Sequence, residues 1–357
     1  MRSRSLQVDS AEGWGINPDP DFVRHLGLDP RRLEEFGSWA TTLPCSSEAP
    51  DAFQGCVVIK NGWIVGEWYS SKDGAERPHP MWSNTKTVAA LLLSVLATRG
   101  NRSVPSLDSQ LYDQRWSADG LPLSASHKAD IRFWHVFAHL SGLMPNEQPG
   151  FLETFESDQH FESYLYGRGH YAAVSGGLFF SPGNDSLPLR ARYSCLGFHH
   201  LCPIFSALSG YSPSAALQEF VLRPLGIRSA VAVPAAKGAG GRYSWNAASG
   251  LWLTARDFAR ILNAFLRRGG PDDYLAASES WIDGYLNVIR RYCVGLEARR
   301  VLGDRAREVV FSRGAGMTWG WAFPSIDLIV VRVGSTPTGL WHLVETSFIR
   351  GMSSLCQ

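Results

Sequence analysis

The sequence predicts a mixed α/β fold of the α+β class, in which helices flank an antiparallel β-sheet built from both ends of the chain. Runs rich in β-branched and aromatic residues occur at 55–69 and again after residue 309, and short helical patterns fill the stretch between them. No internal repeat is visible. Strands at both ends therefore indicate one sheet with a helical insert packed against it.

The same pattern predicts how the chain is divided. The first twenty residues are polar and interrupted by Gly and Pro, which indicates a loosely held arm. The expected divisions are an arm at 1–20, a single domain at 21–347 with sheet segments at about 50–80 and 245–347 and an insert at about 84–240, and a tail at 348–357.

Helix-start and turn signals predict the first elements. Asp29-Pro30 suits the N-cap and the first position of a helix. Two β-rich runs, 55–60 and 63–69, are separated only by Asn61-Gly62, the strongest short hairpin signal. We therefore expect a helix followed by a β-hairpin.

The later elements are predicted in the same way. Thr254 suits an N-cap, and Asp257 is placed to reach back to a free backbone N–H of the cap. An apolar stripe continues this helix as far as Phe265. Late strands are expected at 309–311 and 327–333.

Composition excludes several classes of function. The 357 residues are 45% hydrophobic and carry a net charge of +1, so no charge pattern points to nucleic acid or to an anionic membrane. The longest apolar run, 88–97, is too short to span a bilayer, and the basic start of the chain has no apolar stretch behind it. The six cysteines show no Cys-x-x-Cys spacing and are expected as free thiols in a cytoplasmic protein.

A Ser-x-x-Lys tetrad, Ser83-Asn84-Thr85-Lys86, precedes the apolar run 87–93. If that run is a helix, Ser83 and Lys86 share one face, since they are three residues apart. An amine beside a hydroxyl can take its proton, and the helix dipole favours the resulting alkoxide. The tetrad thus indicates an activated serine, although a capped helix start with a solvated lysine has the same pattern.

Four further segments follow the tetrad in a defined order. They are His139-Leu140-Ser141-Gly142-Leu143, Arg192-Tyr193-Ser194-Cys195-Leu196-Gly197, Arg223-Pro224-Leu225-Gly226-Ile227 and Ser249-Gly250-Leu251-Trp252-Leu253-Thr254-Ala255-Arg256-Asp257. With the hairpin and the tetrad, this order resembles the serine β-lactamase/penicillin-binding-protein superfamily, especially its class C and esterase-like branch, from about residue 50 to 335. The resemblance implies a β-lactamase/transpeptidase-like fold and acyl transfer through a serine.

The resemblance also implies roles for three residues. Ser83 becomes the nucleophile, Lys86 its partner, and Tyr193 the phenol that moves protons between the serine, the lysine and the leaving group. The chemistry requires such a set, because either a neutral lysine or a tyrosinate must accept the serine proton. Without Ser83, Tyr193 would be interpreted as an ordinary core aromatic residue.

The family's third element is an edge strand with Lys-Thr-Gly or a variant of it, and the best match here is Ser312-Arg313-Gly314-Ala315. Gly314 would allow close backbone approach, and the N–H groups of Ala315 and Ser83 would form the oxyanion hole. A register shift within 314–320, or only a glycine-rich turn there, is the alternative. The implied substrate-binding positions are Cys195, Ser312, Arg313, Gly314 and Trp319.

Two departures from the family pattern bear on the substrate. Ser312 replaces a lysine that helps to hold a substrate carboxylate, and Cys195 replaces an asparagine that bonds the substrate amide. Strand alternation would point Arg313 away from the site if Ser312 points in. Both losses argue against β-lactams and peptidoglycan peptides. We expect instead a small ester, amide or thioester donor, and water, an amine or an alcohol as the acceptor.

Other interpretations remain. His135 and His139 have the spacing of two zinc ligands on a helix, but the general base and a third ligand are missing, so neither a metal nor another cofactor is expected. The rival function is a catalytically weak relative that serves as a binding or assembly protein. The altered strand motif favours that rival, whereas the intact Ser83, Lys86 and Tyr193 favour an enzyme.

Overall fold

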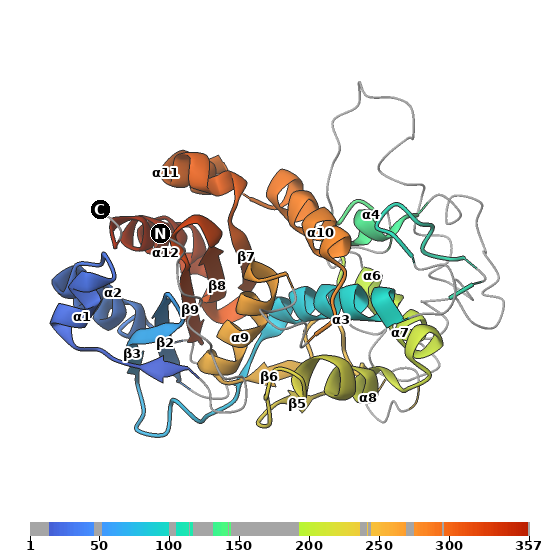
Figure 1. The fold of residues 1–357 in the computed structure, drawn as a ribbon, viewed down its shortest axis with the longest axis horizontal. Coiled ribbons are helices and arrows are strands. Elements are labelled where there is room, and N and C mark those ends of the chain that lie inside the picture. Colours follow the sequence, from blue (N-terminus) through green and yellow to red (C-terminus); the bar gives the residue numbers. More distant parts are fainter. Residues whose placement is uncertain are drawn as a thin grey trace.

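A computed structural model describes residues 14–45, 52–99, 105–113, 115–116, 131–141, 143, 193–235, 241, 244–268, 275–294 and 296–355. Its main feature is a six-stranded sheet in the order β1-β3-β2-β9-β8-β7 (Figure 1). The strands are β1 (Gly15–Ile16), β2 (Gln54–Lys60), β3 (Trp63–Tyr69), β7 (Val310–Gly314), β8 (Thr318–Phe323) and β9 (Leu328–Gly334). All neighbours are antiparallel except the short β1–β3 pair. The predicted sheet from both chain ends is confirmed.

The β2–β3 hairpin turns at the predicted dipeptide. Asn61 and Gly62 have φ values of 51° and 81°, the left-handed conformation that a two-residue hairpin turn requires. The antiparallel pairing of β2 with β9 then joins the start of the chain to its end. Because β2 and β9 are buried along their whole length, this pair forms the centre of the core.

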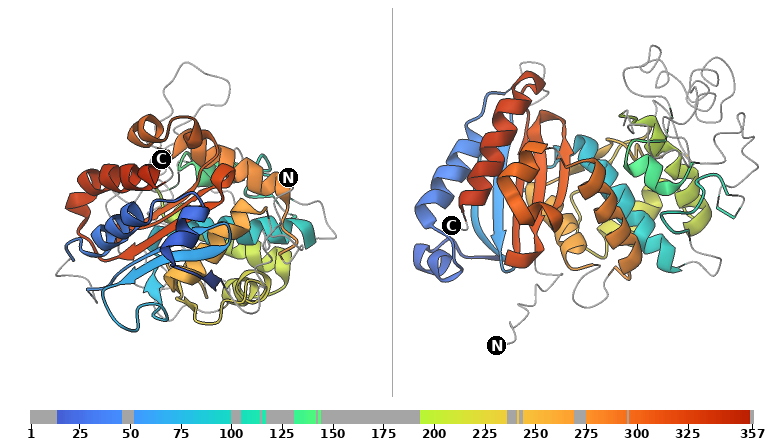
Figure 2. Two further views of the ribbon diagram at one scale, coloured as in Figure 1. Left: turned by 60° about the vertical axis from the view of Figure 1, so that its left-hand side comes forward. Right: turned by 90° about the horizontal axis from the view of Figure 1, so that it is seen from above.

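Helices cover both faces of the sheet (Figure 2). On one face lie α2 (Pro30–Thr41) and α12 (Trp341–Ser354); on the other lie α9 (Ala255–Leu266) and α3 (Thr85–Arg99). The predicted caps of α2 and α9 are confirmed. Asp29 Oδ1 accepts from the Arg31 N–H at 2.9 Å, and Thr254 Oγ1 accepts from the Asp257 N–H at 3.0 Å.

The predicted role of the Asp257 side chain is different in the structure. Its carboxylate accepts a hydrogen bond from Ser229 Oγ at 2.7 Å and lies 3.8 Å from Arg260 Nε. The carboxylate therefore ties α9 to the segment before β5 instead of closing a capping box. A tertiary partner has replaced the local one.

Both predicted chain-end boundaries are corrected. Trp14 is buried and Gly15–Ile16 pairs with β3, so the described part of the expected arm belongs to the domain. The expected tail begins inside α12, where Phe348 and Ile349 are fully buried. Apolar side chains at these positions gain more from burial than an ordered backbone costs.

The helical insert surrounds α3, which is buried on every side from Thr85 to Ala97, as expected for a helix that is apolar all round. The other helices are α1 (Pro20–His25), α4 (Phe133–Phe137), α6 (Leu196–His199), α7 (Leu201–Ser209), α8 (Pro213–Leu217), the π-helix η5 (Gln218–Leu222), α10 (Glu279–Tyr292) and α11 (Leu296–Leu302). A small second sheet, β4-β6-β5, consists of β4 (His79–Pro80), β6 (Leu251–Leu253) and β5 (Val231–Ala232).

Two findings concern the chain as a whole. Among the described residues, Cys45, Cys56, Cys202 and Cys293 are free thiols, and Cys356 lies outside the described residues. None of the helices in the described part of the chain combines the length and apolarity that a membrane span requires.

Candidate active site

The Ser-x-x-Lys tetrad lies where the sheet meets the helical insert. Ser83 is in η1 (Trp82–Asn84), a 3-10 helix of one turn, and Lys86 is in the first turn of α3. Trp82 has a φ of 49°, a conformation that costs a non-glycine residue about 1–3 kcal/mol. The turn is held by Asn84, whose Nδ2 donates to Met81 O at 2.9 Å and to Thr318 O at 2.8 Å. These bonds fix Met81, two residues before the serine, and tie η1 to β8.

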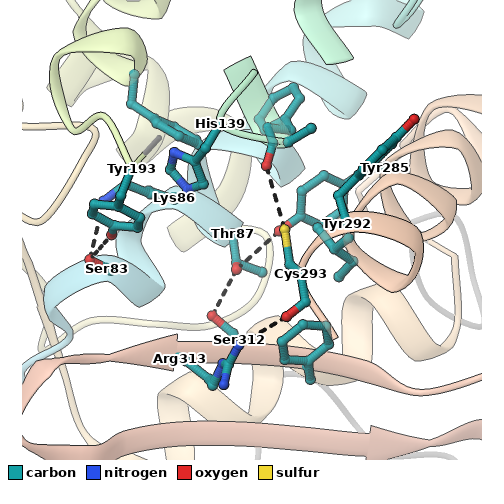
Figure 3. Close-up of a pocket in the computed structure, with 15 residues that line it drawn as sticks. Ser83, Lys86, Thr87, His139, Tyr193, Tyr285, Tyr292, Cys293, Ser312 and Arg313 are labelled. Carbon is teal, nitrogen blue, oxygen red and sulfur yellow. Dashed lines mark hydrogen bonds between the residues drawn. The ribbon is translucent and has the colours of Figure 1, made fainter. Parts of the chain in front are cut away.

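Three predicted residues converge at this turn (Figure 3). Ser83 Oγ is hydrogen-bonded to the hydroxyl group of Tyr193, and Lys86 Nζ donates to Ser83 Oγ at 3.1 Å. Lys86 Nζ also lies 4.8 Å from the ring centroid of Tyr193. The hydroxyl group of the serine therefore has a phenol and an amine within hydrogen-bond reach, although Tyr193 is 110 residues away in sequence.

Lys86 has two further partners besides the serine. Its Nζ donates to Ala248 O at 2.9 Å and to Cys195 Sγ at 3.4 Å. Burial by itself lowers the pKa of Lys86, but negative charge on Tyr193 and Cys195 raises it, and the net direction is upward. We conclude that Lys86 is held as an ammonium ion, the opposite of the neutral lysine that was one of the two predicted bases.

The ring of His139 packs against the ring of Tyr193. The two ring centroids are 4.3 Å apart, and His139 Nδ1 accepts from the Ser194 N–H at 3.3 Å. Burial and the charge of Lys86 lower the pKa of His139 to about 3, so its ring is neutral. The ring therefore orients Tyr193 without adding charge. In the sequence His139 belongs to a family landmark and to a pair with zinc-like spacing, and neither pattern indicates this contact.

The two histidines with zinc-like spacing have separate roles. His135 Nδ1 accepts from the Arg132 N–H at 3.0 Å, while His139 Nδ1 bonds to Ser194. Within the described residues, no group of three or more His, Cys, Asp or Glu side chains is arranged to hold a metal ion.

The predicted strand motif lies on β7, the edge strand of the sheet, and Ser312 faces the tetrad. Ser312 Oγ donates to Asn84 Oδ1 at 2.7 Å. Ser312 Oγ also lies 2.7 Å from Thr87 Oγ1, which in turn accepts from the Tyr285 hydroxyl at 3.2 Å (Figure 3). The position that carries a lysine in the family pattern thus belongs to a chain of neutral hydrogen bonds.

Gly314 makes the close approach that was expected of it. A Cβ atom at this position would lie 2.5 Å from Met81 O and 2.7 Å from Asn84 Nδ2. Ala315 follows directly and begins the short 3-10 turn η8 (Ala315–Met317). The end of β7 therefore contacts η1, and the pairing of the N–H groups of Ala315 and Ser83 remains a prediction.

Two other predicted substrate contacts lie elsewhere. Trp319 is fully buried, and its ring lies 5.1 Å from Phe348 of α12, on the face of the sheet opposite the tetrad, so its predicted contact with substrate is wrong. Arg313 reaches the edge of the site, but its guanidinium group is paired with Glu345 and donates to Cys293 O at 2.9 Å. Arg313 on β7 and Trp319 on β8 are cross-strand partners, and alternation along β7 places Ser312 on the other face of the sheet.

A cavity of about 300 Å³ opens beside Ser83 (Figure 3). Its polar lining includes Ser83, Lys86 and Tyr193 at one end and Thr87 and Ser312 at its base. The remaining wall is largely aromatic and aliphatic, formed by Phe137, Ala138, Phe198, Tyr285, Ile289, Tyr292 and Phe311. The cavity is large enough for one small organic molecule.

Comparisons with known proteins identify the family and the fold. The family model described as Beta-lactamase matches residues 54–342, while no curated protein matches the chain. Among solved structures, EstCE1, a hydrolase with promiscuous acyltransferase activity, has a TM-score of 0.59 at 14% identity, covering 92% of this chain and 100% of EstCE1.

Two further structures share the fold. The octameric penicillin-binding protein homologue from Pyrococcus abyssi has a TM-score of 0.57 at 18% identity, covering 94% of this chain and 76% of its own. A class C beta-lactamase mutant has a TM-score of 0.57 at 14% identity, covering 95% and 99%. At such identities the likeness shows the fold alone.

Proposed function

The chain belongs to the beta-lactamase family, and from this premise we propose that it is a serine acyl-transfer enzyme that works through an acyl-Ser83 intermediate. One observation carries the proposal: Ser83 Oγ is hydrogen-bonded to both Lys86 Nζ and the Tyr193 hydroxyl at the mouth of a cavity. A serine with a proton acceptor and a cation in reach is what nucleophilic catalysis requires.

In the first half-reaction, Tyr193 acts in its tyrosinate form, and the Ser83 proton moves to its oxygen as Oγ attacks the substrate carbonyl carbon. The Lys86 ammonium donates to Ser83 Oγ and stabilises the negative charge that develops on this oxygen as its proton leaves. Tyr193 then passes the proton to the leaving group, whose bond to the carbonyl carbon breaks, and acyl-Ser83 remains.

The second half-reaction reverses these proton transfers. Water, an amine or an alcohol gives its proton to the Tyr193 oxygen and attacks the acyl carbon, and Ser83 Oγ leaves and takes the proton back. Water as acceptor makes the protein an esterase or amidase, whereas an amine or alcohol makes it a transacylase. EstCE1, which shares the fold, is described as a hydrolase with promiscuous acyltransferase activity, so one scaffold supports both outcomes.

Two nearby positions support a small ester, amide or thioester as the acyl donor. Ser312 stands where the family pattern has a lysine, and Arg313 is neutralised by Glu345. A substrate carboxylate would find no free cation from either residue, which disfavours β-lactams and peptidoglycan peptides.

The test is intact-protein mass spectrometry after treatment with a fluorophosphonate. We expect one covalent adduct per chain, located at Ser83 by peptide mapping and lost in Ser83→Ala. Ser94→Ala is the matched control, because Ser94 is on the same helical segment but buried, with Oγ bonded to Leu91 O. No adduct in the wild type, or an unchanged adduct in Ser83→Ala, would favour the rival function as a binding or assembly protein.

A further inference from the structure

The cavity has an exposed end and a buried end. Tyr193 is 40% exposed, whereas Thr87 and Ser312 are each 4% exposed and Tyr285 is 5% exposed. In the proposed reaction Tyr193 protonates the leaving group, so the leaving group must lie beside Tyr193. The acyl group is then directed away from it, into the buried end.

Aromatic and aliphatic side chains form the wall of that buried end. Ile289 and Tyr285 come from α10, and Phe137 comes from the end of α4. Phe137 and Tyr285 meet edge to face with their centroids 5.3 Å apart, which gives the wall a fixed shape. An apolar group placed there is removed from water, and each Å² of apolar surface buried contributes about 25 cal/mol.

The base of the buried end is polar but uncharged, and each hydrogen-bond donor in it is taken up by another residue of the base. Both Nδ2 bonds of Asn84 go to backbone carbonyls, so its Oδ1 accepts from Ser312. Thr87 must then donate to Ser312, and it accepts from Tyr285. Burial raises the pKa of Tyr285, so its hydroxyl keeps the proton that this chain requires.

The described cationic side chains that line the cavity also have polar partners already. Lys86 lies at the Ser83 end, bonded to Ser83, Cys195 and Ala248, and Arg313 is paired with Glu345. A carboxylate buried in the acyl group would lose its hydration without gaining a counter-charge.

We propose that the buried end of this cavity is the acyl-binding pocket and that it selects uncharged aromatic or branched aliphatic acyl groups. The inference rests on the proposed function, because it assumes that Ser83 carries the acyl group. It names Ile289, Tyr285 and Phe137 as the residues that determine specificity.

Esters that share one leaving group test the pocket. The kcat/KM values of the p-nitrophenyl esters of acetic, 3-methylbutanoic and 3-phenylpropanoic acids are compared with that of the singly charged succinic acid ester. We expect the phenylpropanoyl ester to exceed the acetyl ester at least tenfold, and the charged ester to fall at least tenfold below the uncharged ester of similar length. Equal values across the series, or a preference for the charged ester, would overturn the inference.

Variants of Ile289 locate the selectivity. Ile289→Trp, which fills the pocket, should lower the phenylpropanoyl-to-acetyl ratio at least tenfold, and Ile289→Ala, which enlarges it, should shift the preference towards larger groups. Asn287→Trp adds the same bulk to the exposed side of α10 and should leave the ratio unchanged. If both Ile289 variants keep the wild-type ratio, the pocket is not where the acyl group binds.

Labelling separates the two levels of failure. If a short-chain fluorophosphonate labels Ser83 in the wild type and in both Ile289 variants while the ester preferences do not change, the proposed function stands and the pocket inference fails. If Ser83 is not labelled and no ester is cleaved, both fail.

Discussion

Gly314→Ala tests how closely the edge strand must approach the nucleophile turn. Gly314 has an extended φ of −131°, so alanine meets no backbone restriction there, and only the space available to its Cβ atom matters. That atom would lie 2.5 Å from Met81 O, 2.7 Å from Asn84 Nδ2 and 3.2 Å from Trp82 Cβ, where ordinary contact begins at 3.4 Å.

The structure sets the size of the effect. To restore ordinary contact with Met81 O, the turn or the strand must move by about 0.9 Å, and Met81 and Asn84 directly flank the segment that carries Ser83. Since a misplacement of about 1 Å can cost about 10²-fold in rate, we expect kcat/KM for an activated ester to fall between about tenfold and 10²-fold. Overpacking of this kind costs about 1–3 kcal/mol of the free energy of unfolding.

The assay combines ester hydrolysis with urea denaturation, and Gly339→Ala is the matched control. Gly339 is exposed, and no heavy atom lies within 4 Å of the position of its added Cβ, so this variant should match the wild type in both measurements. A Gly314→Ala protein that behaves like Gly339→Ala would refute the close approach. A loss of stability with an unchanged rate would show that the strand yields and the turn does not.

Four further outcomes are expected. Lys86→Ala and Tyr193→Phe should each lower kcat by orders of magnitude, and the double variant should lower it little further, because residues of one proton path fail as a unit. Ester assays in which the two single losses of kcat multiply in the double variant would contradict this. Ala315→Pro removes the predicted oxyanion donor and should cost about 10²–10³ in kcat, with folding checked by circular dichroism, while Ala315→Ser is tolerated. Penicillins and D-Ala-D-Ala peptides should be turned over more slowly than p-nitrophenyl esters at one enzyme concentration. Burial lowers the pKa of His199 to about 3, so between about pH 6.5 and pH 3 the unfolded chain binds a proton that the folded chain does not. The free energy of unfolding therefore falls as the pH drops through this range. His199→Gln should reduce the dependence of that free energy on pH by about 1.4 kcal/mol per pH unit, measured by urea denaturation.

Local signals in the sequence predicted the parts of the fold that local chemistry determines. The hairpin at Asn61-Gly62 and the caps at Asp29 and Thr254 depend on neighbouring residues, and the structure has all three. The convergence of Tyr193 on Ser83 is not local. It was predicted only because the order of motifs resembled a known family, since no spacing rule connects residues 110 positions apart.

Trp319 shows why the strand motif was harder to predict. Side chains alternate along a strand, so residues of one motif divide between two faces, and a shift of one position exchanges them. Ser312 and Gly320 are cross-strand partners on the face that packs against α9, while Arg313 and Trp319 are partners on the face that packs against α12. The glycine-rich segment Gly314-Ala315-Gly316 before β8 left that strand without a clear start in the sequence.

The arginine in β9 is the strongest case of a position that local patterns misjudge. In an apolar run, Arg332 is typical of an exposed strand position, yet it is fully buried in the centre of the sheet. Its guanidinium group donates to Met317 O at 2.6 Å, to Gly316 O at 3.2 Å and to Ala40 O at 3.0 Å. It therefore holds η8, the turn that begins at Ala315, from inside the core.

This contact links the core to the proposed chemistry. Gly316 has a φ of 67°, and a Cβ atom there would lie 2.2 Å from Gly334 O, so the turn is tightly packed as well as hydrogen-bonded. Such packing limits how far the Ala315 N–H can move, and an oxyanion hole depends on donors that are fixed before the reaction begins. The buried arginine is thus explained by the need for a rigid turn at the edge of the sheet, a requirement that only the folded chain makes visible.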